Sequence, residues 1–173
     1  MNQAIKSALT GLAMATVATY ASSTELQDPF YVEPGVLQVG QADEEFVSFD
    51  LEALDALPQV SFETSTIWTD GSSLYSGVSV ATLLEEAGMG EMMEQSGATL
   101  ELVALNDYRV QIPIEDIGDE LPIVATRIDG ETVSIREKGP YWLIYPFDRA
   151  AEYRTEETYK RSIWQLAQMI VLE

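Results

Sequence analysis

Apolar and polar residues alternate in parts of this chain, a pattern typical of half-buried β-strands. The clearest case is the stretch 60–68, which reads Val-Ser-Phe-Glu-Thr-Ser-Thr-Ile-Trp. Two shorter stretches, 51–57 and 80–87, have apolar residues at helical spacing instead. Further strands are predicted at 36–39, 46–49, 99–105, 109–112, 123–128, 132–136, 141–145 and 163–172. We therefore expect an α+β fold that is mostly β, with short helices.

Residues that favour turns and helix ends separate these segments. Ser79 is placed to cap the helix that follows it, and Gly88 is placed to end that helix. Asp129-Gly130 lies between two predicted strands and is a strong signal for a two-residue hairpin turn. Asn106-Asp107 predicts another turn, and the stretch 70–73 predicts a loop. No repeat or linker interrupts the pattern, which indicates a single domain.

The first 21 residues have the features of a secretory signal peptide. Lys6 precedes an uncharged run of small and apolar residues, Ser7 to Ala21, which is shorter than the roughly 20 residues that span a bilayer. We predict cleavage after Ala18 or Ala21, a signal peptide at 1–21 and one domain at 22–173, with no membrane span left after cleavage. The mature protein would be periplasmic in a Gram-negative cell, or secreted. The alternative interpretation is a short N-terminal core helix.

The residue types that the chain lacks exclude several kinds of chemistry. Its 173 residues include no Cys and no His. A disulfide framework, a thiolate metal site, a cysteine nucleophile and a Ser–His triad are therefore excluded. The formal net charge of −20 repels phosphate backbones, so a nucleic-acid partner is not expected. The 46% of hydrophobic residues is enough for a folded core.

The few basic residues are concentrated near the C-terminus. Residues 22–108 contain 17 acidic residues and no basic one, whereas 136–161 contains six basic and five acidic residues. Seven of the 16 aromatic residues lie in or just after that basic stretch. Cations beside flat rings suit a planar ligand that is polar or anionic. The alternative is that the cations offset neighbouring acids and the rings belong to the core.

Five segments, in this order, resemble the molybdopterin-binding domain of the sulfite-oxidase fold. They are residues 64–71, 77–88, 104–113, 138–146 and 161–166. The likeness is greatest to the small, exported, single-domain branch of that superfamily, and it covers about 36–172. It implies a single sulfite-oxidase-like domain with mixed sheets and short helices, and with a pocket for a pterin or for molybdopterin.

One departure from the family changes the function that the resemblance implies. Catalytic members hold molybdenum through a cysteine on the loop after the strand that matches 60–68, and this chain reads Thr64-Ser65-Thr66 there. A hydroxyl or carboxylate in place of a soft thiolate would hold the metal differently. Some members of the small branch are periplasmic pterin-binding proteins that report to a membrane-bound enzyme of cyclic di-GMP metabolism. The resemblance thus implies a non-catalytic protein that binds a reduced pterin without molybdenum and has an inner-membrane signalling partner.

The candidate pterin-binding residues come from the segments that carry the resemblance. Trp68 is a candidate for stacking on the pterin, Asp107 for pairing with its amino-pyrimidinone edge, and Arg161 for holding its opposite side or tail. Each has a plainer alternative, in core packing, turn formation or surface charge. The full candidate set is Thr64, Trp68, Asn106, Asp107, Tyr108, Lys138, Gly139, Pro140, Tyr145, Arg161, Ser162 and Trp164. The pair Glu156-Glu157 is interpreted as a solvated face.

Three functions from different classes remain open at this point. The first is the pterin-binding sensor or adaptor, and the strongly negative chain favours an uncharged pterin over phosphorylated molybdopterin as its ligand. The second is a molybdopterin-dependent oxidoreductase or its accessory subunit. The third is a protein-interaction module whose pocket holds no cofactor.

Overall fold

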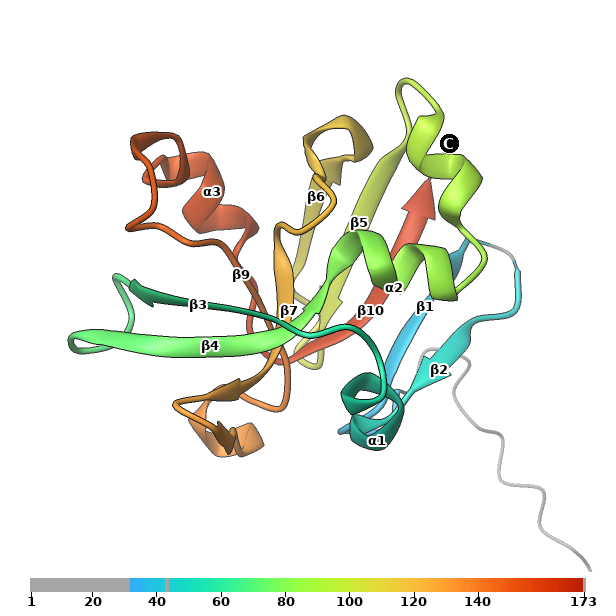
Figure 1. Ribbon diagram of the computed structural model, residues 1–173. Helices are drawn as coiled ribbons and strands as arrows, with labels where there is room; N and C mark the ends of the chain where they lie inside the picture. The colour runs from blue at the N-terminus through green and yellow to red at the C-terminus, as the bar shows by residue number, and fades with distance from the viewer. Residues whose placement is uncertain (1–31, 43, 173) are drawn as a thin grey trace, which may run out of the picture. The chain divides into compact units, whose positions relative to one another are not determined.

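A computed structural model describes residues 32–42 and 44–172 of the chain (Figure 1). The strands are β1 Leu37–Gln41, β2 Val47–Phe49, β3 Val60–Ser65, β4 Ser72–Ser79, β5 Thr99–Ala104, β6 Arg109–Pro113, β7 Ile123–Ile128, β8 Glu131–Thr132, β9 Trp142–Ile144 and β10 Leu166–Leu172. The α-helices are α1 Leu51–Asp55, α2 Val80–Glu86 and α3 Glu156–Arg161. Short 3₁₀ helices are η1 Gly90–Glu94, η2 Ile114–Asp116, η3 Ile135–Glu137 and η4 Ala151–Tyr153.

The first sheet is built around the last strand of the chain. Its strand order is β2-β1-β10-β5-β6, so β10 is the central strand. β1 lies parallel to β10, and the other neighbouring pairs are antiparallel. The Gln168 side chain on β10 donates a hydrogen bond to the Gln38 side-chain oxygen on β1 at 2.9 Å. The sheet is therefore mixed, as predicted.

The second sheet has the order β3-β4-β7-β8, and β9 also pairs with β7. The predicted hairpin at Asp129-Gly130 is confirmed: both residues have positive φ, 53° and 84°, and they join β7 to β8. The β4–β7 register shifts between Ser76 and Gly77. A Cβ atom at Gly77 would lie 2.0 Å from the Val124 carbonyl oxygen, so the close approach of the two strands requires glycine.

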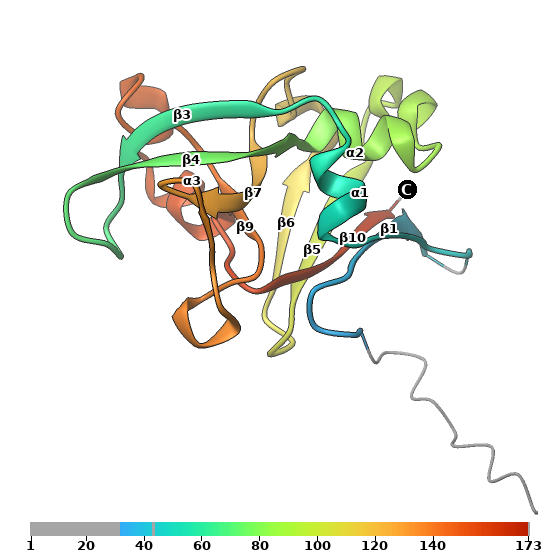
Figure 2. The same ribbon diagram turned by 60° about the horizontal axis from the view of Figure 1, so that its bottom comes forward.

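One continuous apolar core connects the two sheets. Helix α2 buries Val80, Ala81, Leu83 and Leu84 in it and contacts both β4 of the second sheet and β1 of the first. Ser79 caps this helix as predicted, because its hydroxyl accepts a hydrogen bond from the Thr82 amide at 3.1 Å. Figures 1 and 2 show the β3–β4 hairpin extending away from the first sheet on the side where α3 lies.

The structure differs from the sequence prediction around residue 160. The stretch 163–172 was predicted as one strand that Arg161 and Ser162 open, but the strand begins at Leu166. Residues 156–161 form α3 instead, which is capped by the Thr155 hydroxyl as it accepts from the Thr158 amide at 3.1 Å. A helix of six residues shows less than two turns of periodicity, so its pattern carries little signal.

Two other predicted boundaries are wrong. Ser72 and Ser73 were placed in a loop but begin β4, where they pair with Ser65 and Thr64 of β3. The paired residues at that end of the hairpin are all polar, so the sequence shows no alternation of apolar and polar residues there. The predicted strand 132–136 ends at Thr132, and η3 follows.

Among the described helices, none is both long enough and apolar enough to cross a membrane. The predicted signal peptide at 1–21 lies outside the described residues, so it stays a prediction.

Candidate functional site

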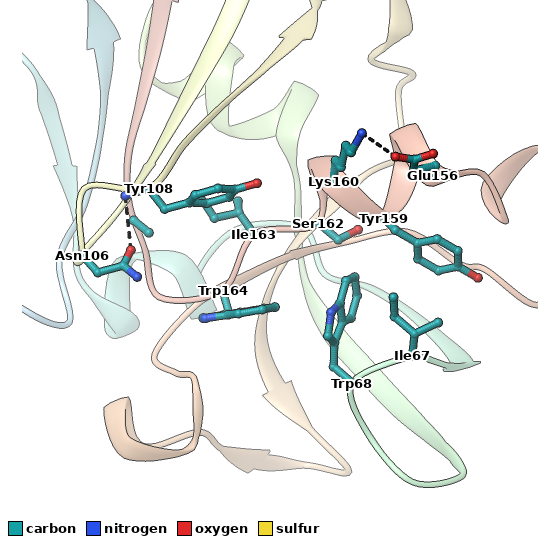
Figure 3. Close-up of a pocket in the computed structure, with 11 residues that line it drawn as sticks. Ile67, Trp68, Asn106, Tyr108, Glu156, Tyr159, Lys160, Ser162, Ile163 and Trp164 are labelled. Carbon is teal, nitrogen blue, oxygen red and sulfur yellow. Dashed lines mark hydrogen bonds and ion pairs between the residues drawn. The ribbon is translucent and has the colours of Figure 1, made fainter.

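A pocket of about 660 Å³ opens between the β3–β4 loop, the β5–β6 turn, α3 and the segment that leads into β10 (Figure 3). This volume falls within the range of about 300–1,000 Å³ that is usual for small-molecule sites. The lining residues are mostly aromatic or aliphatic, with a few polar groups among them. They are Ile67, Trp68, Ala104, Asn106, Tyr108, Glu156, Tyr159, Lys160, Ser162, Ile163 and Trp164.

Trp68 is the centre of an aromatic cluster that forms one wall of the pocket. Its ring centroid lies 5.7 Å from that of Trp164, 5.9 Å from Tyr159, 6.1 Å from Phe147 and 6.3 Å from Trp142. All four contacts are edge-to-face, the arrangement that aromatic pairs favour. The ring planes of Trp68 and Trp164 make an angle of 73°, and Figure 3 shows the two indole rings nearly perpendicular to each other. A flat ring can therefore stack on one indole while its edge meets the other.

The loop at Lys138 supports this aromatic wall. The Lys138 ammonium donates to the Trp68 carbonyl oxygen at 3.3 Å and lies 5.4 Å from the Trp164 ring centroid and 5.9 Å from that of Trp142. The Lys138 carbonyl in turn accepts from the Trp142 indole N–H at 2.6 Å. A Cβ atom at Gly139 would lie 1.9 Å from the Val133 carbonyl oxygen, so the loop can pack here only with glycine. Lys138 thus places positive charge against the rings of Trp142 and Trp164, and Trp164 lines the pocket.

Three of the polar side chains that line the pocket, Glu156, Lys160 and Ser162, come from α3 and the residue that ends it. Lys160 and Glu156, one turn apart on α3, form an ion pair at 2.6 Å. The pairing lowers the pKa of Glu156 and raises the pKa of Lys160, so both are charged at neutral pH and their charges offset each other. The Ser162 hydroxyl donates to the Thr158 carbonyl at 3.0 Å, which leaves its oxygen able to accept a further bond.

The β5–β6 turn brings two further groups to the pocket. The Asn106 side-chain oxygen accepts from the Tyr108 amide at 3.2 Å, and its amide nitrogen makes no hydrogen bond within the described part of the chain. The Tyr108 side chain is 50% exposed and lines the pocket across from Trp164 (Figure 3). This turn therefore offers both a ring and a free hydrogen-bond donor.

The structure brings five of the twelve candidate residues into this pocket: Trp68, Asn106, Tyr108, Ser162 and Trp164. Lys138 and Gly139 lie behind it, as the support for the tryptophans, and Pro140 follows them in the same loop. Thr64, Asp107, Tyr145 and Arg161 are not among the residues that line it.

Each of those four side chains has a different environment. Thr64 is fully buried, and its hydroxyl accepts from the Asp148 amide at 3.1 Å. Asp107 is exposed in the turn, with φ of 63°. Tyr145 is buried and lines a second cavity. Arg161 turns away and forms ion pairs with acidic residues, Asp116 at 2.9 Å and Glu157 at 2.6 Å.

The sequence reasoning did not single out six of the lining residues: Ile67, Ala104, Glu156, Tyr159, Lys160 and Ile163. Tyr159 and Lys160 lie in the stretch where cations and rings are concentrated, so composition pointed to their neighbourhood. Glu156 was interpreted as part of a solvated face. It is indeed highly exposed, but it also lies four residues before Lys160, which is the spacing of a helical ion pair.

Hydrogen bonds within the protein hold the end of β3 and the loop that follows it, where the resemblance leads us to look for a metal-ligating cysteine. The Asp148 carboxylate accepts from the Ser65 amide at 2.6 Å and from the Ser65 hydroxyl at 3.0 Å. The Ser65 amide contributes most to holding the pKa of Asp148 below its ordinary value. The hydroxyls of Thr66 and Thr69 bond to each other at 2.7 Å. Across the described residues, no group of three or more carboxylates is placed to hold a metal ion.

The sequence matches no protein-family model and no curated protein. The fold, however, is similar to a solved structure, the sulfane dehydrogenase SoxCD from Paracoccus pantotrophus, with a TM-score of 0.57 and 19% sequence identity. The match covers 79% of this chain and 37% of the SoxCD chain, so this chain spans little more than a third of that chain's length. The likeness shows the fold alone. It agrees with the sequence-based expectation of a sulfite-oxidase-like α+β domain that is mostly β.

Proposed function

We propose that this protein binds a pterin in the aromatic pocket and does so without molybdenum and without catalysing a reaction. The observation that carries the proposal is the pair of crossed indoles, Trp68 and Trp164, in a pocket of about 660 Å³. The five candidate residues that line this pocket come from segments that resemble a pterin-binding domain.

The chemistry of the pocket suits a flat heterocycle with a polar edge. A pterin is a planar two-ring system, and stacking between an indole and a heterocycle of this kind is favourable. Its amino-pyrimidinone edge presents donors and acceptors side by side. The free Asn106 amide nitrogen and the Ser162 hydroxyl oxygen are able to pair with such an edge. The ring would stack between Trp164 and Tyr108, and its edge would meet the amide and hydroxyl.

The charge of the pocket favours an uncharged pterin. The Glu156–Lys160 pair is neutral as a whole, and Lys138 is engaged with the Trp68 carbonyl and the faces of two tryptophans. The chain as a whole carries a net charge of −20, which slows the approach of an anion at low salt. A reduced pterin with a hydroxylated side chain is uncharged near neutral pH. It therefore needs no free cation in the pocket, and the negative chain does not repel it.

The similarity to SoxCD favours a second candidate, a subunit that carries molybdopterin in an oxidoreductase. The pterin part of that cofactor would fit the same aromatic pocket. Its metal would require a ligand near Ser65 and Thr66, whose hydroxyls already bond to Asp148 and Thr69. We therefore propose the metal-free pterin as the ligand.

The cellular role that we propose is that of an exported sensor. It rests on the signal-like pattern of residues 1–21 and on the resemblance to periplasmic proteins that report pterin to an inner-membrane signalling enzyme. Fractionation and N-terminal sequencing of the native protein test export. A mature chain that begins near Thr19 or Ser22, outside the cytoplasm, is expected, and an intact Met1 on a cytoplasmic protein would contradict it.

Titration with tetrahydrobiopterin under anaerobic conditions, together with elemental analysis, tests the ligand. We expect quenching of tryptophan emission, because Trp68 and Trp164 line the pocket, and far less than one molybdenum per chain in protein purified from its native compartment. Stoichiometric molybdenum that is lost on replacing Ser65 or Thr66 would establish the oxidoreductase instead. If the protein binds neither tetrahydrobiopterin nor molybdenum, the interaction module without a cofactor becomes the better account.

A further inference from the structure

Four residues other than glycine have a positive φ in the described part of the chain, and three of them lie beside the aromatic pocket. They are Asp107 at 63°, Asp129 at 53°, Lys138 at 74° and Gln165 at 54°. Asp107 lies in the turn that carries Tyr108. Lys138 donates to the Trp68 carbonyl oxygen, and Gln165 directly follows Trp164. A left-handed backbone is costly for a residue with a side chain, and such residues are concentrated at functional sites.

Gln165 differs from the other three in its place in the chain. Asp107 and Asp129 lie in turns, and aspartate tolerates the left-handed region because its short polar side chain can bond locally. Lys138 ends η3, and a left-handed residue is common at the end of a helix. Gln165 lies instead directly before β10, which begins at Leu166. Contacts with other segments must therefore hold it in this conformation.

Three hydrogen bonds connect Gln165 to segments that are distant in the sequence. Its backbone amide donates to the Lys138 carbonyl at 3.2 Å, and its carbonyl accepts from the Leu105 amide at 2.9 Å. Its side-chain amide nitrogen donates to the Ile135 carbonyl at 2.8 Å. The same Lys138 carbonyl also accepts from the Trp142 indole N–H at 2.6 Å. Gln165 therefore joins the segment that leads into β10 to the β5–β6 turn and to the loop that contains Lys138.

These bonds bear on the position of Trp164, the pocket residue next to Gln165. In a regular strand Trp164 would share a face with Leu166, which is buried. The left-handed residue between them interrupts that alternation, and Trp164 lines the pocket across from Tyr108 (Figure 3). The turn that carries Tyr108 is bonded to the same residue, so the backbone of Gln165 links the two rings that face each other.

We propose that Gln165 is a positioning residue for the bound pterin and holds the Trp164 ring where a flat ring can stack between it and Tyr108. Gln165 does not line the pocket, so it acts through Trp164. The inference rests on the proposed function, because it assigns a role in binding that same ligand. A pocket whose walls are in place binds without the cost of ordering them. If residue 165 leaves the left-handed region in some molecules, the apparent dissociation constant rises as the competent fraction falls.

Two substitutions at this position separate the backbone conformation from the side-chain hydrogen bond. Gln165→Gly and Gln165→Val both remove the bond to the Ile135 carbonyl. Glycine adopts a positive φ readily, whereas a β-branched valine strongly resists it. Titration of the full protein with tetrahydrobiopterin should give an affinity within about threefold of the parent for Gln165→Gly. The dissociation constant of Gln165→Val should be roughly tenfold higher than that of the parent. Equal affinities of the two variants would overturn the proposal.

Asp129→Val is the matched control for a general loss of stability. It places valine at the positive φ of 53° in the β7–β8 turn, and Asp129 does not line the pocket. Its unfolding temperature should fall, while its affinity for tetrahydrobiopterin should equal that of the parent. If it loses as much affinity as Gln165→Val, the effect is a general one and the proposal is wrong.

Gln165→Ala replaces Gln165→Val if the valine variant does not fold. Alanine also disfavours the left-handed region, so Gln165→Ala should bind tetrahydrobiopterin several-fold more weakly than Gln165→Gly. Equal binding by these two variants also contradicts the proposal.

Near-ultraviolet circular dichroism of the ligand-free proteins separates this inference from the proposed function. The Trp164 ring centroid lies 5.7 Å from that of Trp68 and 6.0 Å from that of Trp142, so the spectrum of the neighbouring indoles depends on where Trp164 lies. Gln165→Val should change the spectrum, whereas Gln165→Gly and Asp129→Val should keep that of the parent. If the parent binds no pterin, the proposed function and this inference both fail. If it binds tetrahydrobiopterin and Gln165→Val keeps the parent's spectrum, this inference alone fails.

Discussion

Replacing Tyr108 by Ala should weaken pterin binding while leaving the fold unchanged. The ring lines the aromatic pocket from the β5–β6 turn, and half of its surface is exposed. Its backbone carbonyl, which any residue would supply, accepts the hydrogen bond from the Ala104 amide at 2.9 Å. The substitution therefore removes one face of the pocket without opening the core, and the unfolding free energy should change by no more than about 0.5 kcal/mol.

The size of the binding effect follows from the exposure of the ring. Stacking of a heterocyclic base on an aromatic side chain contributes about 1–3 kcal/mol by alanine substitution. Because Tyr108 is half exposed, we place its contribution in the lower part of that range, at about 1–2 kcal/mol. This corresponds to a dissociation constant roughly 5- to 30-fold higher than that of the parent.

Quenching of tryptophan emission during titration with tetrahydrobiopterin measures this change, and circular dichroism confirms that the variant is folded. Tyr108→Phe keeps the ring and should bind as the parent does. Asp107→Asn is the matched control in the same turn, because Asn tolerates the positive φ of 63° at that position. It removes the nearby carboxylate, yet it should not alter binding, since Asp107 does not line the pocket. Parent-like affinity in Tyr108→Ala, or a loss in Asp107→Asn, would refute the assignment of the pocket.

Two further predictions concern stability. The pKa of Asp148 is lowered from 3.8 by hydrogen bonds from Ser65, so this stabilisation is present above pH 3.8 and is lost as the pH falls through the folded-state pKa. Asp148→Asn should therefore lower the unfolding temperature at pH 7, and thermal scans should show the difference from the parent shrinking below pH 3.8; a constant difference would contradict the reasoning. Gly139→Ala should destabilise the protein by about 1–3 kcal/mol in denaturant titrations, because its Cβ would meet the Val133 carbonyl oxygen at 1.9 Å. Gly118→Ala, where the nearest atom is 3.6 Å away, is the control and should unfold as the parent does.

Local signals in the sequence predicted much of the fold. Ser79 and Asp129-Gly130 act within three or four residues, through a cap and a turn, and both are in place in the structure. The alternation at 60–68 predicted β3 because one face of that strand is buried and the other is exposed. These features depend on near neighbours in the chain, which is the information that a single sequence carries most directly.

The parts that the sequence did not predict depend on contacts between distant segments. The short helix α3 has too few turns for a periodic pattern. Its Arg161 forms an ion pair with Asp116, which lies 45 residues earlier in the sequence. Nothing in the local sequence shows that Arg161 faces acidic residues while Tyr159, two positions earlier, faces the aromatic pocket. The composition of the stretch 136–161 located the region of the pocket, but the direction of each side chain depended on the tertiary structure.

The central position of β10 in the first sheet has a consequence for folding. β1, near the start of the described chain, pairs with β10, near its end, with Gln38 opposite Gln168. The first sheet therefore lacks its central strand until the last residues are available, and its contacts join distant parts of the sequence. Folding rates fall as the separation of contacting residues grows, so this domain should fold slowly for its size. A chain shortened before Leu166 should leave β1 and β5 without their shared neighbour and remain unfolded.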